Sequence, residues 1–236
     1  GSTAADDRDG NDRDLDPVAV LSALLRIGYS DLVTLVVTSL LTTLLAIPLV
    51  TLGGALLALE DTLTTIVTAE GRTSAPQSER ARIGYFWDSF RANLTRGVPY
   101  SVLLVLVSFT AVWYVSIAFS TGSSAFLLGS VVGLYAVVIV TVWVLRAMSL
   151  VVRADEAPRF RTAMRDGWYS LLEELSFTAL QAIVAATFVL ISLWLWAAIP
   201  LLLPGALVLL EIVSYEELSG DGASALVLGY RGELHE

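Results

Sequence analysis

The sequence contains no cysteine and no lysine, and its single histidine, His235, is the next-to-last residue. The lack of cysteine excludes disulfides, thiolate metal sites and thiol nucleophiles. Because a terminal histidine is expected to be solvated, hydrolysis by a serine–histidine pair is excluded in practice. The sequence also lacks a P-loop, a paired glycine-rich fingerprint and any cluster with metal-ligand spacing inside its apolar runs. We therefore expect no enzyme activity and no cofactor.

The charges are unusual in kind as well as in number. All 14 basic residues are arginines, against 23 aspartates and glutamates, which leaves a formal charge of −9. This lysine-free acidic composition resembles that of proteins from salt-loving archaea, in which carboxylates keep a protein hydrated in concentrated salt. It lacks the basic footprint that a phosphate backbone requires, so nucleic acid is not expected as a partner.

Long apolar runs make up most of the chain. Hydrophobic residues account for 56% and charged residues for 16%, with a mean hydropathy of +0.72, which is far more apolar than a soluble domain of 236 residues. This composition predicts an integral membrane protein. Residues 1–16 are acidic, contain no apolar segment of signal-peptide type and are expected to be a disordered tail. We expect one membrane-embedded helical domain over 17–218 and a polar C-terminal tail over 219–236.

An interruption by proline and glycine occurs twice inside the apolar runs. Residues 46–56 read AIPLVTLGGAL and residues 198–207 read AIPLLLPGAL, and a glutamate follows the last glycine of each copy six residues later. Proline removes a backbone donor and glycine lowers helix stability, so the chain can turn in both places. We interpret the copies as bends of helical hairpins, with Thr51 placed to cap the returning helix. The bend residues are Pro48, Thr51, Gly53, Gly54, Pro200, Pro204 and Gly205, and the glutamates are Glu60 and Glu211.

The lengths of the uncharged runs predict three hairpins. As single helices, residues 32–59 would measure roughly 42 Å, residues 97–145 about 74 Å and residues 175–210 about 54 Å, against a hydrocarbon core of about 30 Å. The longest run divides at the small polar residues 120–124. We predict an all-α membrane bundle of three helical hairpins with six membrane segments, two of the hairpins being broken at proline and glycine. In the alternative, residues 32–59 form one tilted span, which gives five spans and an external N-terminus.

The arginines lie mainly in two links between the hairpins. Ten of the fourteen occur between Glu70 and Arg96 or between Arg146 and Glu174, and none occurs in the three turns. Since arginine-rich loops face the cytoplasm, the six-span prediction puts the links and both termini in the cytoplasm and the turns outside the cell membrane.

Each link carries a segment of the same pattern. Phe90–Gly97 and Phe160–Gly167 share the order F-R-x-x-apolar-x-x-G, so that Phe160 and Arg161 repeat Phe90 and Arg91. At helical spacing the apolar side chains share one face and the arginine lies on the other. We predict two amphipathic cytoplasmic helices that lie at the inner membrane interface.

The first bend and the first link together resemble a known family. Pro48-Leu49-Val50-Thr51, followed by Ala55 and, about thirty residues on, by a motif in the link, resembles the YesL-like family of integral membrane proteins, also known as a domain of unknown function. The resemblance implies a small multi-helix membrane protein of a kind commonly encoded beside carbohydrate uptake systems, without an established activity and without a catalytic residue to carry over. The link motif consists of Phe86, Trp87, Phe90, Arg91 and Asn93.

Two functions remain open from the sequence. Transporters place substrate sites at broken helices, so Glu60, Asp61 and Glu211 form a candidate polar pocket for a small solute or ion; alternatively, these carboxylates reach water at the inner interface. The spans flanking residues 120–124 contain few polar groups besides serine and threonine, which favours an accessory or scaffolding subunit of a membrane system. The expected partners are the lipid bilayer and either another membrane protein or a second copy of this chain. A hydrated cavity lined by Glu60 and Glu211 would favour transport, and a solid apolar interior would favour the accessory role.

Overall fold

The computed structural model describes residues 17–68, 78–154, 156–173, 175–195 and 201–219. The predicted acidic tail over 1–16 lies outside these residues, as do Pro200 of the second bend and all but the first residue of the predicted tail over 219–236.

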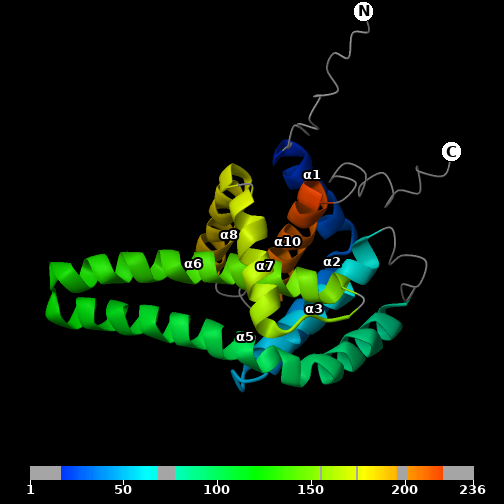
Figure 1. Ribbon diagram of the computed structural model, residues 1–236, viewed down its shortest axis with the longest axis horizontal. Helices are drawn as coiled ribbons and strands as arrows, with labels where there is room; N and C mark the ends of the chain where they lie inside the picture. Colours follow the sequence, from blue (N-terminus) through cyan, green and yellow to red (C-terminus); the bar gives the residue numbers. More distant parts are fainter. Residues whose placement is uncertain (1–16, 69–77, 155, 174, 196–200, 220–236) are drawn as a thin grey trace, which may run out of the picture.

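Every regular element in the described residues is an α-helix, which confirms the all-α prediction (Figure 1). In chain order the helices are α1 (Pro17–Ser30), α2 (Leu32–Ala46), α3 (Leu52–Val67), α5 (Glu79–Thr121), α6 (Ser124–Arg153), α7 (Phe160–Glu173), α8 (Leu175–Trp194) and α10 (Leu203–Ser219). Three of them, α5, α6 and α8, are long and apolar enough to cross a membrane. The pair α1 and α2, bent by 87° at its break, makes a fourth if it is counted as one span.

The first bend lies where the sequence predicts it. α2 ends at Ala46 and α3 begins at Leu52, with Pro48 between them and Leu49 in the left-handed region at φ 57°. Thr51 occupies the N-cap position of α3, but the prediction that its side chain caps this helix is wrong. Its hydroxyl instead donates to the carbonyl of Leu45 and ties the bend to the end of α2.

The prediction that Gly53 and Gly54 let the chain turn is also wrong, because both lie in the first turn of α3. They are buried against Gly97 of α5, where an added Cβ would come within 2.0 Å of the Gly54 nitrogen. Because these glycines have no side chains, the backbones of α3 and α5 can cross in direct contact. Pro204 and Gly205 likewise lie in the first turn of α10 rather than in a bend. A proline at this position costs little stability, because the backbone N–H that it lacks would have no hydrogen-bond partner within the helix.

α5 is one continuous helix of 43 residues that passes through Pro99. The prediction of a separate amphipathic helix over Phe90–Gly97 is therefore wrong, because the structure joins that segment to the apolar run after it. α5 ends at Thr121 and is followed by Gly122, which has a left-handed φ of 63°. α6 begins at Ser124, so the predicted turn is confirmed. Along this hairpin, Gly129 packs on Tyr114 and Gly133 on Ala111.

α7 corresponds to the second predicted amphipathic helix. It buries Ala163, Met164, Gly167 and Leu171 and exposes Arg161 and Arg165. Gly167 allows a close crossing with α6, because a Cβ at this position would lie 3.1 Å from the nitrogen of Ala147.

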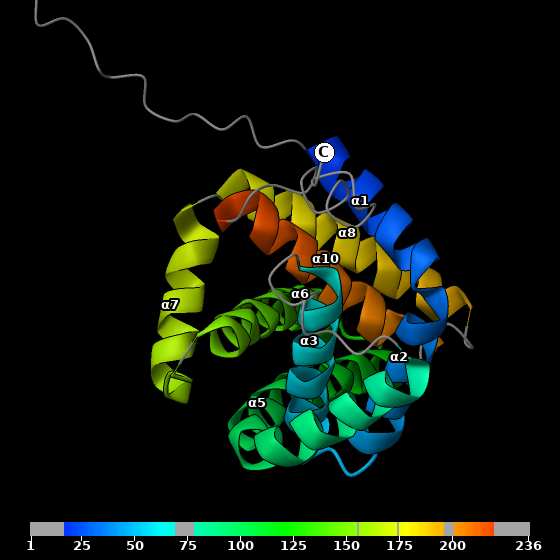
Figure 2. The same cartoon turned by 90° about the vertical axis from the view of Figure 1, so that its right-hand side faces the viewer.

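The helix pairs α2–α3, α5–α6 and α8–α10 correspond to the three predicted hairpins, but they do not align as one bundle. Figure 1 shows the α5–α6 pair projecting from the rest of the molecule as an arm, with α8 and α10 running across it, and Figure 2 looks along this arm from its base. α10 lies centrally and contacts α1, α2, α3, α6 and α8. The core therefore forms where α3 and α10 meet the base of the arm, and this is where the predicted glutamates lie.

Candidate functional site

The two copies of the repeated bend make the same contact with a neighbouring helix. The backbone nitrogen of Gly53 donates to the hydroxyl of Ser101 on α5 at 2.7 Å. The nitrogen of Gly205 donates to the hydroxyl of Ser39 on α2 at 2.9 Å. A side chain would block this approach, since a Cβ at Gly205 would lie 2.4 Å from the Ser39 oxygen. The sequence repeat is thus a structural repeat, in which each copy starts the helix that carries a glutamate.

Both glutamates reach one face of α6. Glu60 on α3 and Glu211 on α10 are fully buried. On α6, Arg146, Ser149 and Arg153 are three and four residues apart and so share a face. The Ser149 hydroxyl donates to Glu60 Oε1 at 2.6 Å. Arg146 Nε lies 2.9 Å from Glu211 Oε1, and this ion pair is completely buried.

Gln181 of α8 completes the buried ion pair. Its amide nitrogen donates to Glu211 Oε2, and its carbonyl oxygen accepts from Arg146 Nη2 at 3.3 Å. A fully buried charge is costly unless it is paired and hydrogen-bonded. Helices α6, α8 and α10 together meet this requirement for Glu211.

A second ion pair lies next to the buried one, nearer the solvent. Arg153 pairs with Glu216 of α10, and both side chains are partly exposed. The ring of Tyr215 lies against both arginines, with its centroid 4.2 Å from Arg153 Cζ and 5.4 Å from Arg146 Cζ. We call the whole set the α6 charge cluster: Glu60, Arg146, Ser149, Arg153, Gln181, Glu211, Tyr215 and Glu216.

The α6 charge cluster is not fully satisfied by the residues that the structure describes. Among these residues, Glu60 Oε2 and Arg146 Nη1 are buried without a hydrogen-bond partner. A cavity of about 20 Å³ between α1, α8 and α10 reaches Gln181 and Ser214, and its other walls are apolar. This volume suits about one water molecule. This cavity can therefore hold a water molecule beside Gln181, but not a solute the size of a sugar.

Asp61, the third member of the predicted pocket, faces a different helix. Its Oδ2 accepts from the Ser89 hydroxyl at 2.6 Å and its Oδ1 from the Tyr85 hydroxyl at 3.1 Å, both on α5. Asn93 donates to the Ser89 hydroxyl at 3.2 Å. The structure thus separates Asp61 from Glu60 and Glu211 and uses it to join α3 to α5.

The link motif contributes mainly to packing. Phe86 and Phe90 are buried in the core. Trp87 is exposed, and the guanidinium carbon of Arg91 lies 5.1 Å from the centroid of its ring. In the second copy, Phe160 meets the Tyr100 ring edge-on with 4.8 Å between centroids, and Arg161 is exposed. Neither copy joins the α6 charge cluster.

Sequence reasoning missed the partners of the two glutamates. The sequence makes Arg146 the first residue of a link, whereas in the structure α6 continues to Arg153 and Arg146 is fully buried. Ser149 and Gln181 were not singled out at all. A signal was present, because the polar residues at 146, 149 and 153 have the spacing of one helical face.

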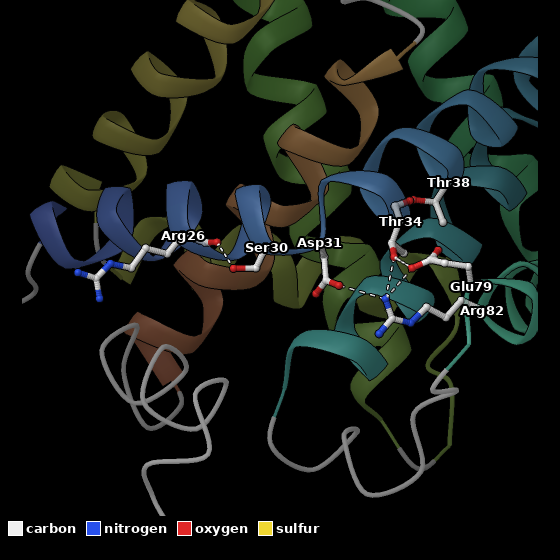
Figure 3. Close-up of polar contacts among 7 residues, drawn as sticks. All are labelled: Arg26, Ser30, Asp31, Thr34, Thr38, Glu79 and Arg82. Carbon is white, nitrogen blue, oxygen red and sulfur yellow. Dashed lines mark hydrogen bonds and ion pairs between the residues drawn. The ribbon is translucent and has the colours of Figure 1, made fainter.

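A separate polar contact fixes the break between α1 and α2 (Figure 3). Arg82 of α5 donates to Asp31 Oδ1 at 3.0 Å, to Thr34 Oγ1 at 2.7 Å and to Glu79 Oε1 at 3.2 Å. The Thr34 hydroxyl in turn donates to Glu79 Oε1 at 2.8 Å. Since Asp31 is the residue between the two helices, the start of α5 holds the 87° bend in place.

Comparison of the chain with protein-family models, with curated proteins and with solved structures gave no match. The resemblance to the YesL-like family therefore stays a prediction from the residues that carry it.

Proposed function

We propose that the chain is a non-enzymatic integral membrane protein that serves as an accessory or scaffolding subunit of a membrane system. The observation that carries this proposal is the apolar surface of the α5–α6 arm. A water-soluble monomer rarely exposes so large a continuous apolar patch, and lipid hydrocarbon is the partner that such a surface fits. The exposed side chains include Val102, Leu106, Phe109, Val112, Leu127, Leu128, Val132 and Leu134, each more than half exposed.

The dimensions and charges of the arm support a transmembrane placement in the cell membrane. Residues 98–121 of α5 would measure roughly 36 Å along the helix axis, enough for a hydrocarbon core of about 30 Å. Exposed arginines lie at the base of the arm, on the first part of α5 and on α7, whereas the described residues at its tip around Gly122 include no arginine. By the positive-inside rule the base is cytoplasmic. We extend this to six spans with both termini in the cytoplasm.

The accessory role is favoured over solute transport by the interior of the core. The cavity that reaches Gln181 holds about one water molecule, and the ion pair beside it is already bonded to neighbouring side chains. If the chain belongs to the YesL-like family that it resembles, the membrane system that it serves is a carbohydrate-uptake system.

Ion transport is the second candidate, because Glu60, Glu211 and Arg146 are fully buried ionisable residues. Such residues within a membrane domain often serve an ion pathway.

Purification from native membranes in mild detergent, followed by reconstitution, distinguishes the two. An accessory subunit should elute with a second polypeptide at a fixed ratio, and vesicles that contain this chain alone should show no ion flux. A chain that elutes without another polypeptide and carries flux by itself would overturn the accessory proposal.

A further inference from the structure

The two structurally equivalent glutamates have unequal partners. Glu211 meets an arginine on α6, whereas Glu60, at the same distance from its glycine in the repeated bend, meets a serine three residues further along that helix. Among the described residues the fully buried charged side chains are Glu60, Glu211 and Arg146. Two carboxylates therefore share one fully buried arginine, and Arg146 forms its ion pair with Glu211.

Arg153, the other arginine of the α6 charge cluster, does not form an ion pair with Glu60. Arg153 forms an ion pair with Glu216 nearer the solvent. Glu60 Oε1 accepts from the Ser149 hydroxyl, which is neutral, and Glu60 Oε2 has no hydrogen-bond partner in the part of the chain that the structure describes. An unpaired carboxylate is strongly disfavoured in such a place, whereas a carboxylic acid is neutral and avoids the cost of burying a charge.

We propose that Glu60 is a proton-binding site, in which a proton taken from solvent bonds to Oε2 of the carboxylate and converts it to a neutral carboxylic acid. Glu211 stays ionised against Arg146. The proton leaves to solvent when Glu60 ionises, and no other bond changes. This inference concerns the interior of the protein and does not depend on the accessory role or on the number of spans.

The groups around Glu60 set the balance between its two states. From α10, Glu211 carries charge of the same sign and favours the bound proton, whereas Glu216 is paired with Arg153. From α6, Arg146 and Arg153 favour its release, although each is already paired with one of those glutamates. Tyr215 and Gln181 are uncharged, and Asp61, the neighbour on α3, is turned toward Tyr85 and Ser89 of α5.

Two matched substitutions test the assignment in the full-length protein in detergent. Glu60→Gln replaces a neutral acid by a neutral amide, so we expect an unchanged melting temperature at acidic pH, where the carboxyl group is protonated in both the folded and the unfolded chain. At neutral pH we expect a higher melting temperature than that of the wild type, because only the unfolded wild-type chain ionises Glu60 there. Glu211→Gln leaves the Arg146 guanidinium buried and unpaired, so we expect a melting temperature several degrees lower. The wild-type melting temperature should fall as pH is raised until Glu60 ionises, and Glu60→Gln should remove this decline.

Infrared difference spectroscopy between low and high pH gives a second readout, because it detects a protonated carboxyl group directly in the folded wild type. The wild type should show the carbonyl stretch of a buried protonated carboxylic acid at neutral pH, and Glu60→Gln should lack it. Loss of stability in Glu60→Gln equal to that in Glu211→Gln, or absence of the carbonyl band from the wild type, would overturn the proposal.

Discussion

The crossing of α3 and α5 allows a prediction with a control on the same helix. Gly97→Ala should destabilise the protein, because the new Cβ would lie 2.0 Å from the Gly54 nitrogen and 2.5 Å from Gly54 Cα, both backbone atoms. Gly84→Ala, also on α5, should not, because a Cβ at Gly84 would have no atom within 4 Å.

The magnitudes follow from opposing effects. At both positions alanine favours the helix over glycine by about 1 kcal/mol. At Gly97 the helices must separate, which costs about 1–3 kcal/mol in strained packing, and the bond from the Gly53 nitrogen to Ser101 is lost or weakened, which costs about 1 kcal/mol more. Because the clash is with backbone and no side chain can rotate away, we take the upper end of the packing cost. We therefore expect Gly97→Ala to lower the free energy of unfolding by about 2–3 kcal/mol and Gly84→Ala to raise it by up to about 1 kcal/mol.

Thermal unfolding in one detergent at one pH provides the comparison. For a chain of this size the expected changes correspond to a fall of about 5–10 °C for Gly97→Ala and a rise of a few degrees for Gly84→Ala. Equal melting temperatures for the two variants would refute the close crossing. A Gly97→Ser variant, which adds the same Cβ, should be at least as unstable as Gly97→Ala.

Three further predictions address the threading, the bend and the N-terminal tail. In intact cells, an impermeant maleimide should label Thr121→Cys at the tip of the arm but not Glu156→Cys near its base until the cells are permeabilised; the reverse pattern would invert the proposed orientation. Arg82→Gln should lower the free energy of unfolding by about 1–2 kcal/mol through loss of the bonds at Asp31 and Thr34, and the double variant with Asp31→Asn should cost less than the sum of the single variants. Arg26→Gln, an exposed change on α1, serves as its control and should have no effect. Deletion of residues 1–16 should leave the melting temperature unchanged, since only Leu15 in this segment could join a core, and a drop of several degrees would show that the tail docks.

The sequence predicts the helices well and their contacts poorly. The break around Pro48 and the turn within 120–124 follow from local chemistry, because proline and glycine act on the backbone wherever they occur. The roles of Gly53, Gly54 and Gly97 do not, since a glycine that permits a turn and one that permits a helix crossing look alike in one sequence. Only the partner helix decides between them.

The α6 charge cluster shows the same limit for electrostatics. Glu60 and Glu211 attract attention because they follow a repeated motif, but Arg146 looks like the first residue of a solvated link. Burial of an arginine depends on a carboxylate that arrives from α10, 65 residues later in the chain. Hydropathy counts such an arginine as the end of an apolar run, whereas the structure continues the helix past it.

The unbroken course of α6 has a mechanical consequence. The helix is held at its base by the ion pair with Glu211 and by the crossing with α7, while its distal half is paired with α5 and otherwise exposed. From Arg146 to Ser124 the helix axis extends about 33 Å. A tilt of about 5° at the base would therefore move the tip by about 3 Å, as a lever does, given the rise per residue of a helix. A small shift of α6 among the buried side chains at its base would thus appear as a larger displacement at the far end of the arm.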